Sequence, residues 1–218
     1  MYKNISTAPP HQGVYIKHTG RMYWFPKTHF HQVFSGVRYL QHNVLAPEFL
    51  NRADRPITNH THLTNKYDLN TSCHLCRYAS SIDRSDLAPL YIKFIHKEIG
   101  YGVFARRFIP KKTFIGMYTG TIKLNYQIKQ AGYAFSYMPD SQCAQQSLVL
   151  DAASAGNETR FINDSPYPNI HQYACFYQNR WHLIFIAAQD IQTDKQLFFD
   201  YGEDYFRRMG IKRHVLNA

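Results

Sequence analysis

Short apolar runs separated by turn-forming residues are the feature that most constrains the fold of this chain. They recur from residue 90 onward, and Gly, Pro, Asn and Asp interrupt them. Runs of about four to eight residues bounded in this way are typical of strands. We expect strands at residues 90–95, 113–118, 147–150, 173–177, 182–187 and 196–199. Because the spacing is irregular and no regular helices intervene, the sequence predicts a mostly β fold with few helices and long loops.

Residues 1–88 differ from the rest, with many His, Asn, Thr and Tyr residues and little sustained periodicity. A helix is predicted over residues 31–49, where apolar side chains recur at helical spacing: Val33, Val37, Leu40, Val44 and Leu45. The 218 residues suffice for one catalytic-sized domain and a smaller appendage. We therefore divide the chain into a small N-terminal region of unknown class (1–88), a main domain (89–202) and a C-terminal tail (203–218).

The charge balance favours an anionic environment. Lys and Arg outnumber Asp and Glu by 25 to 15, which gives a formal net charge of +10, and no segment forms a basic tail. Such a charge favours contact with nucleic acid or chromatin. No apolar run approaches the roughly 18 residues of a membrane span, and the first residues do not resemble a cleaved signal peptide. The four cysteines do not make a disulfide scaffold. We expect a soluble intracellular protein in a reducing compartment.

One segment of the N-terminal region carries residue types that bind zinc. Two residues separate Cys73 from Cys76, and His60, His62 and His74 lie nearby. Together they could supply four ligands for a structural zinc ion. The spacing matches no familiar zinc finger, and two buried or free thiols in a His-rich segment are the favoured alternative. We therefore expect no metal at the functional site.

Three motifs in the main domain carry the functional signal. The first is Gly100-Tyr-Gly102-Val-Phe-Ala105, whose glycines allow a tight turn beside a ligand, although a plain hairpin is the alternative. The second runs from Asp151 to Asn169 and places amides and carboxylates on both sides of an apolar Phe-Ile pair. The third is Leu197-Phe-Phe-Asp-Tyr201-Gly202, an aromatic strand that ends in a Tyr before a Gly turn.

In this order and spacing, the motifs resemble the signature of the SET-domain protein-lysine methyltransferases. The resemblance runs from about Leu90 to Gly202 and includes the strand end Ile115-Gly-Met117-Tyr118-Thr-Gly120. It implies the SET-domain β fold, a set of small curved sheets with a knot-like C-terminal substructure. The chain is most similar in size to the short stand-alone SET proteins of intracellular bacteria and large DNA viruses, which lack the Cys-rich C-terminal element. No Rossmann-type glycine motif is present.

The resemblance also implies roles for individual residues. It makes S-adenosyl-L-methionine the methyl donor, Tyr201 the catalytic tyrosine and Tyr118 a tyrosine of the channel that admits the substrate lysine. Phe199, Tyr205 and Phe206 would line that channel, although the last two are alternatively packing residues of a terminal helix. A Phe at position 199 implies a di- or trimethyl-lysine product. The implied donor-binding residues are Gly100, Tyr101, Gly102, Tyr133, Arg160, Phe161, Asn163 and Asp164.

Two positions depart from the family pattern. Met117 stands where the family usually has an acid, and Asp164 stands where it usually has a His. The expected function is donor-dependent methylation of lysine in a protein, with histone tails favoured. The alternatives are a non-histone basic DNA-binding or ribosomal substrate, or a catalytically weak SET module that serves as a chromatin or nucleic-acid adaptor. A histone substrate implies action in the nucleus or on chromatin, in the protein's own cell or in a host cell.

A substrate that is itself basic should be repelled by a chain of net charge +10. Two arrangements would resolve this. Either the peptide groove is locally acidic, with Asp140, Asp164, Glu203 and Asp204 as candidates, or the basic surface engages DNA around the histone tail.

Overall fold

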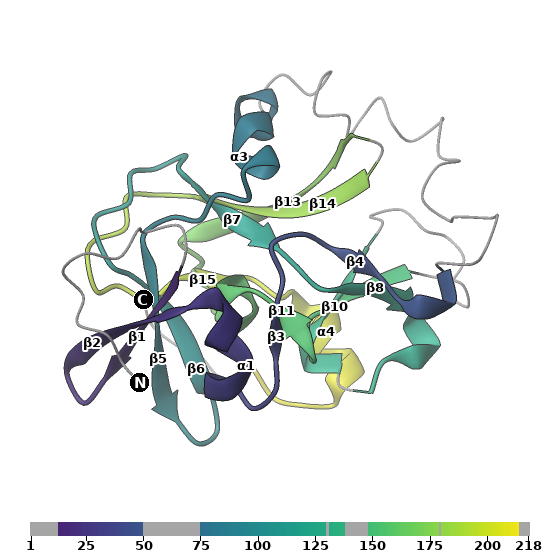
Figure 1. The fold of residues 1–218 in the computed structure, drawn as a ribbon, viewed down its shortest axis with the longest axis horizontal. Coiled ribbons are helices and arrows are strands. Elements are labelled where there is room, and N and C mark those ends of the chain that lie inside the picture. Colours follow the sequence, from purple (N-terminus) through teal and green to yellow (C-terminus); the bar gives the residue numbers. More distant parts are fainter. Residues whose placement is uncertain (1–12, 50–74, 130, 138–147, 179, 214–218) are drawn as a thin grey trace.

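The computed structural model describes residues 13–49, 75–129, 131–137, 148–178 and 180–213, and β-strands dominate it (Figure 1). The α-helices in these ranges are short: α1 (Phe30–Val33), α3 (Ala79–Asp83) and α4 (Glu203–Met209). Single 3₁₀ turns complete the helical part: η2 (Lys27–His29), η3 (Pro47–Phe49), η4 (Cys76–Tyr78), η5 (Asn125–Gln127), η6 (Ala131–Tyr133) and η7 (Glu158–Phe161). The predicted mostly β class is confirmed. None of the described helices has the length and apolarity to cross a membrane.

Most of the predicted strands are present with similar bounds. They are β5 (Leu90–His96), β7 (Phe114–Tyr118), β10 (Leu148–Asp151), β13 (Ile170–Tyr177) and β14 (Arg180–Ala187). The last predicted strand, residues 196–199, is shorter in the structure, as β15 (Phe198–Phe199). The first glycine motif is itself a strand, β6 (Gly100–Ala105), which pairs antiparallel with β5. Short apolar runs bounded by turn residues were therefore sufficient to predict the strands other than β6.

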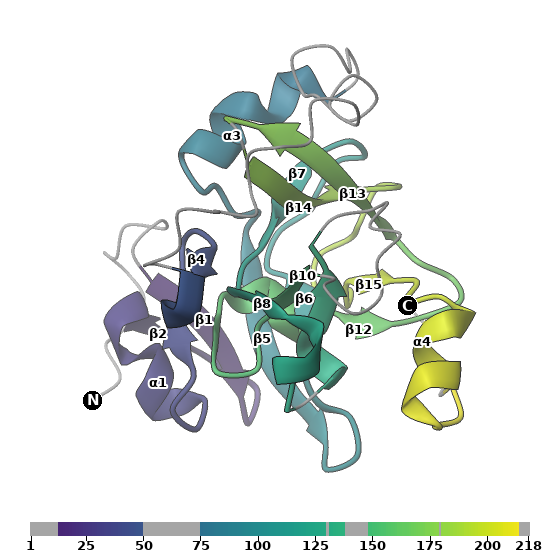
Figure 2. The same cartoon turned by 90° about the vertical axis from the view of Figure 1, so that its right-hand side faces the viewer.

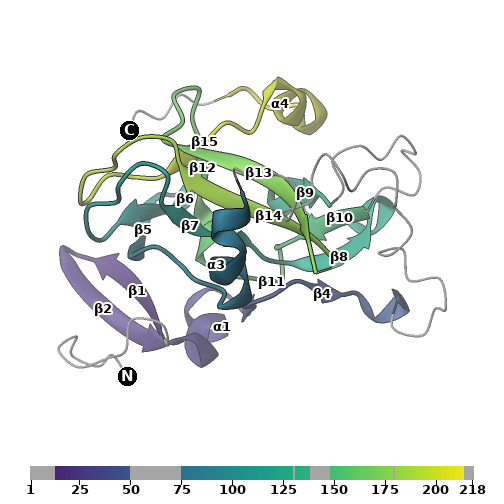
Figure 3. The ribbon, with the colours of Figure 1, turned by 90° about the horizontal axis from the view of Figure 1, so that it is seen from above.

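Two four-stranded sheets and one three-stranded sheet form the framework (Figure 1). The first has the order β2-β1-β5-β6, with β1 (Gly13–His18) and β2 (Arg21–Pro26) forming a hairpin whose β1 runs parallel to β5. The second has the order β4-β8-β10-β9 and adds β4 (Val44–Leu45), β8 (Thr121–Leu124) and β9 (Ala134–Ser136). The third has the order β13-β14-β7, and α3 packs against it (Figure 3).

The N-terminal segment contributes strands to these sheets. Besides β1 and β4, β3 (Arg38–Tyr39) pairs parallel with β11 (Ala155–Gly156). Phe30 and Phe34 lie in the same core cluster as Phe161 of the second motif. The boundary at residue 88 therefore marks a change in amino-acid composition. Strands from both sides of it pair within the same sheets.

The predicted helix over residues 31–49 is wrong. The helix α1 ends at Val33, and Ser35 and Gly36 follow with φ angles of 50° and 83°. This left-handed pair turns the chain out of the helix, and β3 and β4 follow as extended segments. Of the five apolar residues at helical spacing, Val37 and Leu40 are buried. Their spacing matched a helix although they lie on a turn and on extended chain.

Two distant segments meet at the centre of the molecule. β12 (Asn163–Asp164) pairs parallel with β15, so that Asn163 stands opposite Phe198 and Asp164 opposite Phe199. The side chain of Asn169 supports the pair: its Nδ2 donates to the Gln196 carbonyl at 2.8 Å, and its Oδ1 accepts from the Phe198 N–H at 2.9 Å. Figure 2 shows α4 beside this pair. The second and third motifs therefore converge, as the resemblance implies.

Candidate functional site

An aromatic cluster surrounds Tyr201, which follows β15 and precedes α4. Its ring centroid lies 4.5 Å from that of Phe199, 4.8 Å from that of Tyr205 and 6.4 Å from that of Phe206. Gly202, with a φ of 80°, turns the chain from Tyr201 into α4. A non-glycine residue would be strained there. The turn therefore brings the two aromatic residues of α4 back over Tyr201.

The Tyr201 hydroxyl is held by one backbone group. It donates to the carbonyl oxygen of Ile162 at 2.7 Å. Burial raises the pKa of Tyr201 well above its ordinary value, and the neighbouring phenols of Tyr118 and Tyr205 add to the shift. The phenol is therefore neutral near pH 7, and it can orient a partner through its oxygen lone pairs but does not act as a strong base.

Tyr118, at the end of β7, joins the same cluster through ring contacts with Phe135 and Phe185. Its hydroxyl donates to the Tyr133 carbonyl at 2.7 Å, and its ring centroid is 4.6 Å from that of Phe135. Burial is also the main reason why the pKa of Tyr118 is raised. Tyr133, which the sequence assigned to donor binding, thus supplies the backbone acceptor that fixes Tyr118.

Phe199 connects Tyr201 with the rings that pack on Tyr118. It is buried, and its ring lies 5.5 Å from Phe135 and 5.1 Å from Phe185 in addition to its contact with Tyr201. The sequence did not select Phe135 or Phe185 as site residues. The sequence signal for Phe135 was its place two residues after Tyr133. The pairing of Phe185 with Gly116 of β7 is seen only in the structure. We call Tyr118, Phe135, Phe185, Phe199, Tyr201, Tyr205 and Phe206 the aromatic chamber.

A second cluster joins the first glycine motif to the Arg-Phe-Ile-Asn segment. The Tyr101 ring lies 5.4 Å from Phe161, 5.1 Å from Phe34 and 5.5 Å from Phe94. The Asn163 Nδ2 donates to the Tyr101 carbonyl at 3.0 Å. The structure therefore brings three of the predicted donor-binding residues, Tyr101, Phe161 and Asn163, into one place. Phe34 is a contribution from the N-terminal segment that no motif indicated.

Glycine is favoured at positions 100 and 102 of the first motif for two different structural reasons. Gly100 has a φ of 77°, which favours glycine at the turn into β6. At Gly102 a Cβ atom would lie 2.6 Å from the Gln196 Nε2 and 2.7 Å from the Ile95 Cδ1. This Nε2 is buried and has no hydrogen-bond acceptor among the described residues. Gly102 thus makes room for a neighbouring amide beside the second cluster.

Arg160, another predicted donor contact, is buried and engaged with the protein. Its Nε donates to the Ala152 carbonyl at 2.8 Å and its Nη2 to the Ala153 carbonyl at 3.1 Å. The guanidinium carbon lies 4.1 Å from the Tyr133 ring centroid and 4.6 Å from that of Phe161. Burial lowers the pKa of Arg160. Arg160 therefore fixes the loop after β10 and the two aromatic residues beside it.

The two departures from the family pattern have structural partners. Met117 is buried in a core cluster with Phe114 and Ile184, and its carbonyl accepts hydrogen bonds from Asn157 and Thr159. The Asp164 carboxylate accepts the Tyr201 backbone N–H at 2.9 Å and forms an ion pair with Arg213. The Met117 side chain thus packs in the core, and the Asp164 carboxylate fixes the segment that carries Tyr201.

The zinc hypothesis falls largely outside the described residues. His60, His62, Cys73 and His74 lie there, and Cys76 belongs to η4. Within the described ranges, no group of three or more His, Cys, Asp or Glu side chains could hold a metal ion.

Comparison with known proteins agrees with this geometry. Residues 100–202 match the model of the SET domain family. The chain is 30% identical over 149 residues to the "Histone-lysine N-methyltransferase, H3 lysine-9 specific" of Schizosaccharomyces pombe, and the match covers 62% of this chain and 30% of that protein. The chain thus spans less than a third of this curated relative.

Solved structures share the fold. ATXR5 in complex with histone H3.1 superimposes with a TM-score of 0.57 at 19% identity, over 77% of this chain and 82% of that one. The structure titled "ctPRC2 in an autoinhibited conformation bound to S-adenosylmethionine" gives a TM-score of 0.50 at 22% identity, over 66% of this chain and 20% of that one. The family match, the sheets and the convergence of the motifs agree: residues 100–202 of this chain form a SET domain.

Proposed function

We propose that the protein is an S-adenosyl-L-methionine-dependent protein-lysine N-methyltransferase. The observation that carries the proposal is the aromatic chamber, in which two neutral tyrosines fixed by backbone carbonyls face a wall of phenylalanines. Methyl transfer to an amine needs a neutral nucleophile aligned at near-attack distance. Free lysine has a pKa near 10.4, so burial between aromatic walls favours the neutral amine.

The chamber residues have distinct tasks in this proposal. Tyr201 orients the lysine amine through its hydroxyl oxygen, whose proton is already directed at the Ile162 carbonyl. Tyr118 and Phe199 line the channel, and the fixed dipoles favour the transition state without reorganisation. Tyr205 and Phe206 cover the outer side of Tyr201. The C-terminal tail is thereby assigned the closure of the lysine channel.

The second cluster fits the methyl donor. The cluster combines the aromatic surface of Tyr101 and Phe161 with two polar groups, the Asn163 amide and the buried Gln196 Nε2, which has no acceptor among the residues that the structure describes. When bound, the donor supplies an electrophilic methyl group on a sulfonium. Tyr101, Phe161 and Asn163 would hold it, whereas Arg160 and Asp164 act through the segments that they fix. The choice of donor is supported by the ctPRC2 structure of the same fold, whose title states that it is bound to S-adenosylmethionine.

Asn163→Ala tests the donor site. Removing the amide takes away the link to the Tyr101 carbonyl and one polar contact for the donor, so we expect donor affinity to fall about tenfold or more. Calorimetric titration with S-adenosyl-L-methionine and with its demethylated product measures this. Asn125→Ala, at an exposed asparagine of η5, is the matched control. Wild-type protein that binds neither ligand would contradict the proposed function.

The product should include di- or trimethyl-lysine. The Phe199 ring packs on Tyr201 and Phe135 and presents no hydroxyl to the chamber. A hydroxyl with an ordered water would be worth about 1 kcal/mol, close to tenfold in relative rate. Phe199→Tyr should therefore shift the product toward monomethyl-lysine at a similar first-step rate. Mass spectrometry of a peptide taken to completion decides the matter, and wild-type product that stays monomethylated would refute the role of Phe199.

Histone tails are the proposed substrate class, because the Schizosaccharomyces pombe relative is named as specific for lysine 9 of histone H3. Such a substrate implies action on chromatin. The acidic groove considered from the sequence is partly neutralised, since Asp164 and Glu203 contact Arg213 and Asp204 pairs with Arg207. Asp140 lies outside the described residues. This favours the other arrangement, in which the basic surface contacts DNA.

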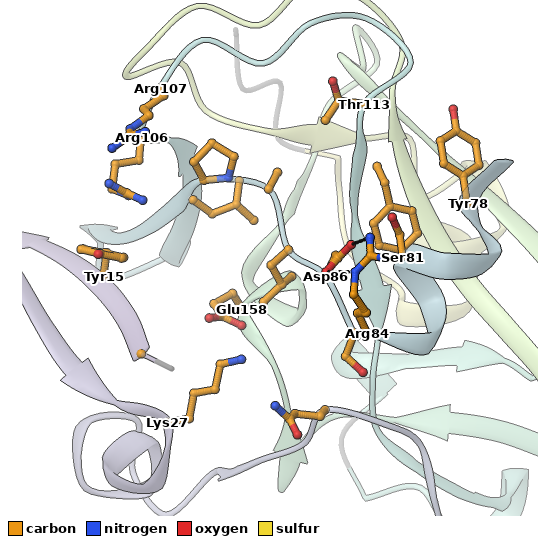
Figure 4. Close-up of a pocket in the computed structure, with 18 residues that line it drawn as sticks. Tyr15, Lys27, Tyr78, Ser81, Arg84, Asp86, Arg106, Arg107, Thr113 and Glu158 are labelled. Carbon is orange, nitrogen blue, oxygen red and sulfur yellow. Dashed lines mark hydrogen bonds and ion pairs between the residues drawn. The ribbon is translucent and has the colours of Figure 1, made fainter. Parts of the chain in front are cut away.

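A basic groove offers a place for that DNA contact. It has a volume of about 970 Å³ and is lined by Lys27, Arg84, Arg106 and Arg107 (Figure 4). Arg84 pairs with Asp86, whereas Lys27, Arg106 and Arg107 form no ion pair with a carboxylate in the described part of the chain. Glu158 also faces the groove, but it accepts the Tyr39 hydroxyl at 2.9 Å, and burial raises its pKa. The charged wall is therefore predominantly positive.

Arg106 is arranged to contact a phosphate. Its guanidinium carbon lies 4.1 Å from the Tyr15 ring centroid, and its Nε is buried without a hydrogen-bond acceptor among the described residues. Burial, together with the neighbouring Arg107, lowers the pKa of Arg106, so an anion would relieve both effects. A planar guanidinium stacked on a ring is suited to phosphate oxygens. We therefore place the DNA contact of this proposal in the groove.

The double variant Arg106→Gln with Arg107→Gln tests the groove. Removing one phosphate-binding charge should lower the slope of log affinity against log salt by about 0.9, so for two charges we expect a decrease of about two and weaker binding of a duplex DNA. Fluorescence anisotropy at several salt concentrations measures it. Lys129→Gln with Lys195→Gln removes two exposed lysines outside the groove and is the control. An unchanged slope in the arginine variant would exclude this surface.

A further inference from the structure

The helix α4 carries the outer aromatic residues of the chamber, yet none of its side chains is fully buried. Its seven residues follow the Gly202 turn and end at Met209. Gly210, with a φ of 61°, then turns the chain out of the helix. A helix of two turns gains little stability by itself. Something beyond core burial must therefore hold Tyr205 and Phe206 against Tyr201.

Arg213 makes the contacts that can do this. Its Nε and Nη2 donate to the two carboxylate oxygens of Asp164 at 2.7 and 2.8 Å, in a bidentate pair. The Nη2 also donates to Asp200 at 2.8 Å, and the Nη1 reaches Glu203 at 3.4 Å. The guanidinium carbon lies 5.3 Å from the Phe206 ring centroid. One side chain thus touches β12, the turn after β15 and α4.

The burial of this pair separates it from ordinary surface ion pairs. The side chains of Arg213 and Asp164 are 17% and 10% exposed, whereas those of Arg207 and Asp204 on α4 are 77% and 79% exposed. Exposed pairs contribute little, but a bidentate pair shielded from water has both strength and a defined geometry. Three carboxylates also converge on Arg213, and without it they would repel one another.

Asp164 connects this pair to the reacting side of the site. The same Oδ1 atom that accepts from Arg213 accepts the backbone N–H of Tyr201 at 2.9 Å. Asp200, the other carboxylate bound by the Nη2, accepts the backbone N–H of Gly202 at 2.9 Å. The network therefore spans both ends of the turn that places Tyr201 beneath α4.

We propose that Arg213 is a positioning residue, which ties α4 to Asp164 and so holds Tyr205 and Phe206 against Tyr201 as the outer wall of the lysine channel. The role in the reaction rests on the proposed function, whereas the attachment of α4 does not. Asp164, a departure from the family pattern, then has a defined use as the anchor for Arg213. The wall should affect peptide binding and leave donor binding unaltered, because the proposed donor contacts Tyr101, Phe161 and Asn163 come from β6, η7 and β12 and not from α4.

Arg213→Gln in the full chain tests the proposal by hydrogen–deuterium exchange and by kinetics. We expect amides of residues 203–211 to exchange about tenfold faster, with β5, β13 and β14 unchanged. The KM for a peptide substrate should rise about fivefold or more, while donor affinity stays within about twofold. Arg213→Lys, which keeps the charge but not the bidentate geometry, should give intermediate values. Arg207→Gln, which removes an exposed arginine of α4 itself, is the matched control.

Each outcome distinguishes the two claims. Unchanged exchange at α4 in Arg213→Gln would overturn the attachment. Faster exchange with unaltered KM would show that α4 is no wall of the channel and would overturn the positioning role, while the proposed function stands. Wild-type protein without methyl transfer would remove the proposed function and the reaction role with it, and the exchange measurement would still decide whether Arg213 holds α4.

Discussion

Tyr201→Phe should lower turnover about 100-fold or more while donor binding stays near that of the wild type. The change removes one hydroxyl, which donates to the Ile162 carbonyl and lies at the centre of the aromatic chamber. A phenylalanine ring keeps the packing against Phe199 and Tyr205. Losing the hydrogen bond costs about 1 kcal/mol of folding free energy, a decrease of roughly 2–4 °C in the melting temperature, so the loss of turnover would reflect the site.

Single-turnover kinetics with a lysine peptide measure the rate, and calorimetry measures donor binding in the same preparation. Tyr177→Phe is the matched control, because Tyr177, the last residue of β13, donates its hydroxyl to Asp83 at the end of α3, outside the chamber. A Tyr201→Phe variant that keeps its rate would move the catalytic role to another residue of the chamber, with Tyr118 the next candidate.

Arg160→Met should destabilise the fold by about 3 kcal/mol, which corresponds to a decrease of roughly 6–12 °C in the melting temperature. The methionine fills much of the same volume but leaves the carbonyls of Ala152 and Ala153 without their charged donor. It also removes the cation from between the Tyr133 and Phe161 rings. Thermal unfolding followed by circular dichroism measures the change.

The exposed Arg21 of β2 provides the control, since Arg21→Met removes an arginine without burying any polar group. We expect its melting temperature to stay within about 2 °C of the wild type. An Arg160→Met variant as stable as the wild type, with donor binding abolished, would contradict the structural role and would assign Arg160 to direct donor contact.

The strands and the ordered motifs could be predicted because their signals are local. Short apolar runs between turn residues predicted β5, β7, β13 and β14, and the motif order of the resemblance implied that Tyr118, Phe199 and Tyr201 share one site. The helix over 31–49 failed because helical spacing alone does not register Ser35 and Gly36, which turn the chain. Periodicity reports which side chains face the core, but not the backbone path between them.

Long-range pairings were beyond the sequence for a physical reason. The parallel pairing of β1 with β5 depends on two extended segments whose paired residues lie 76 positions apart (Ile16 and Ile92), and no local pattern specifies the partner. Arg213 is similarly 49 residues from Asp164. One arginine in a chain with 25 Lys and Arg residues gives no sign of its partner. The contact of Phe34, in the N-terminal segment, with Tyr101 of the second cluster was unpredictable for the same reason.

The motif positions also did not separate residues that contact a ligand from residues that position other parts of the protein. Arg160 and Asp164 were both expected as donor contacts, and the structure shows what they bind within the protein: two carbonyls for Arg160, and Arg213 with the Tyr201 N–H for Asp164. A motif reports that a side chain is required at a position. Its hydrogen-bond partners report why.

The most direct test of the central claim is methyl transfer itself. The full chain is incubated with isotopically labelled S-adenosyl-L-methionine and a panel of histones, nucleosomes and other basic DNA-associated or ribosomal proteins, and the products are identified by mass spectrometry. The account predicts label on lysine side chains of a histone, carried as di- or trimethyl-lysine by the wild type and strongly reduced with Tyr201→Phe. Label absent from every lysine in the panel, in protein that binds the donor, would contradict it and favour the adaptor alternative.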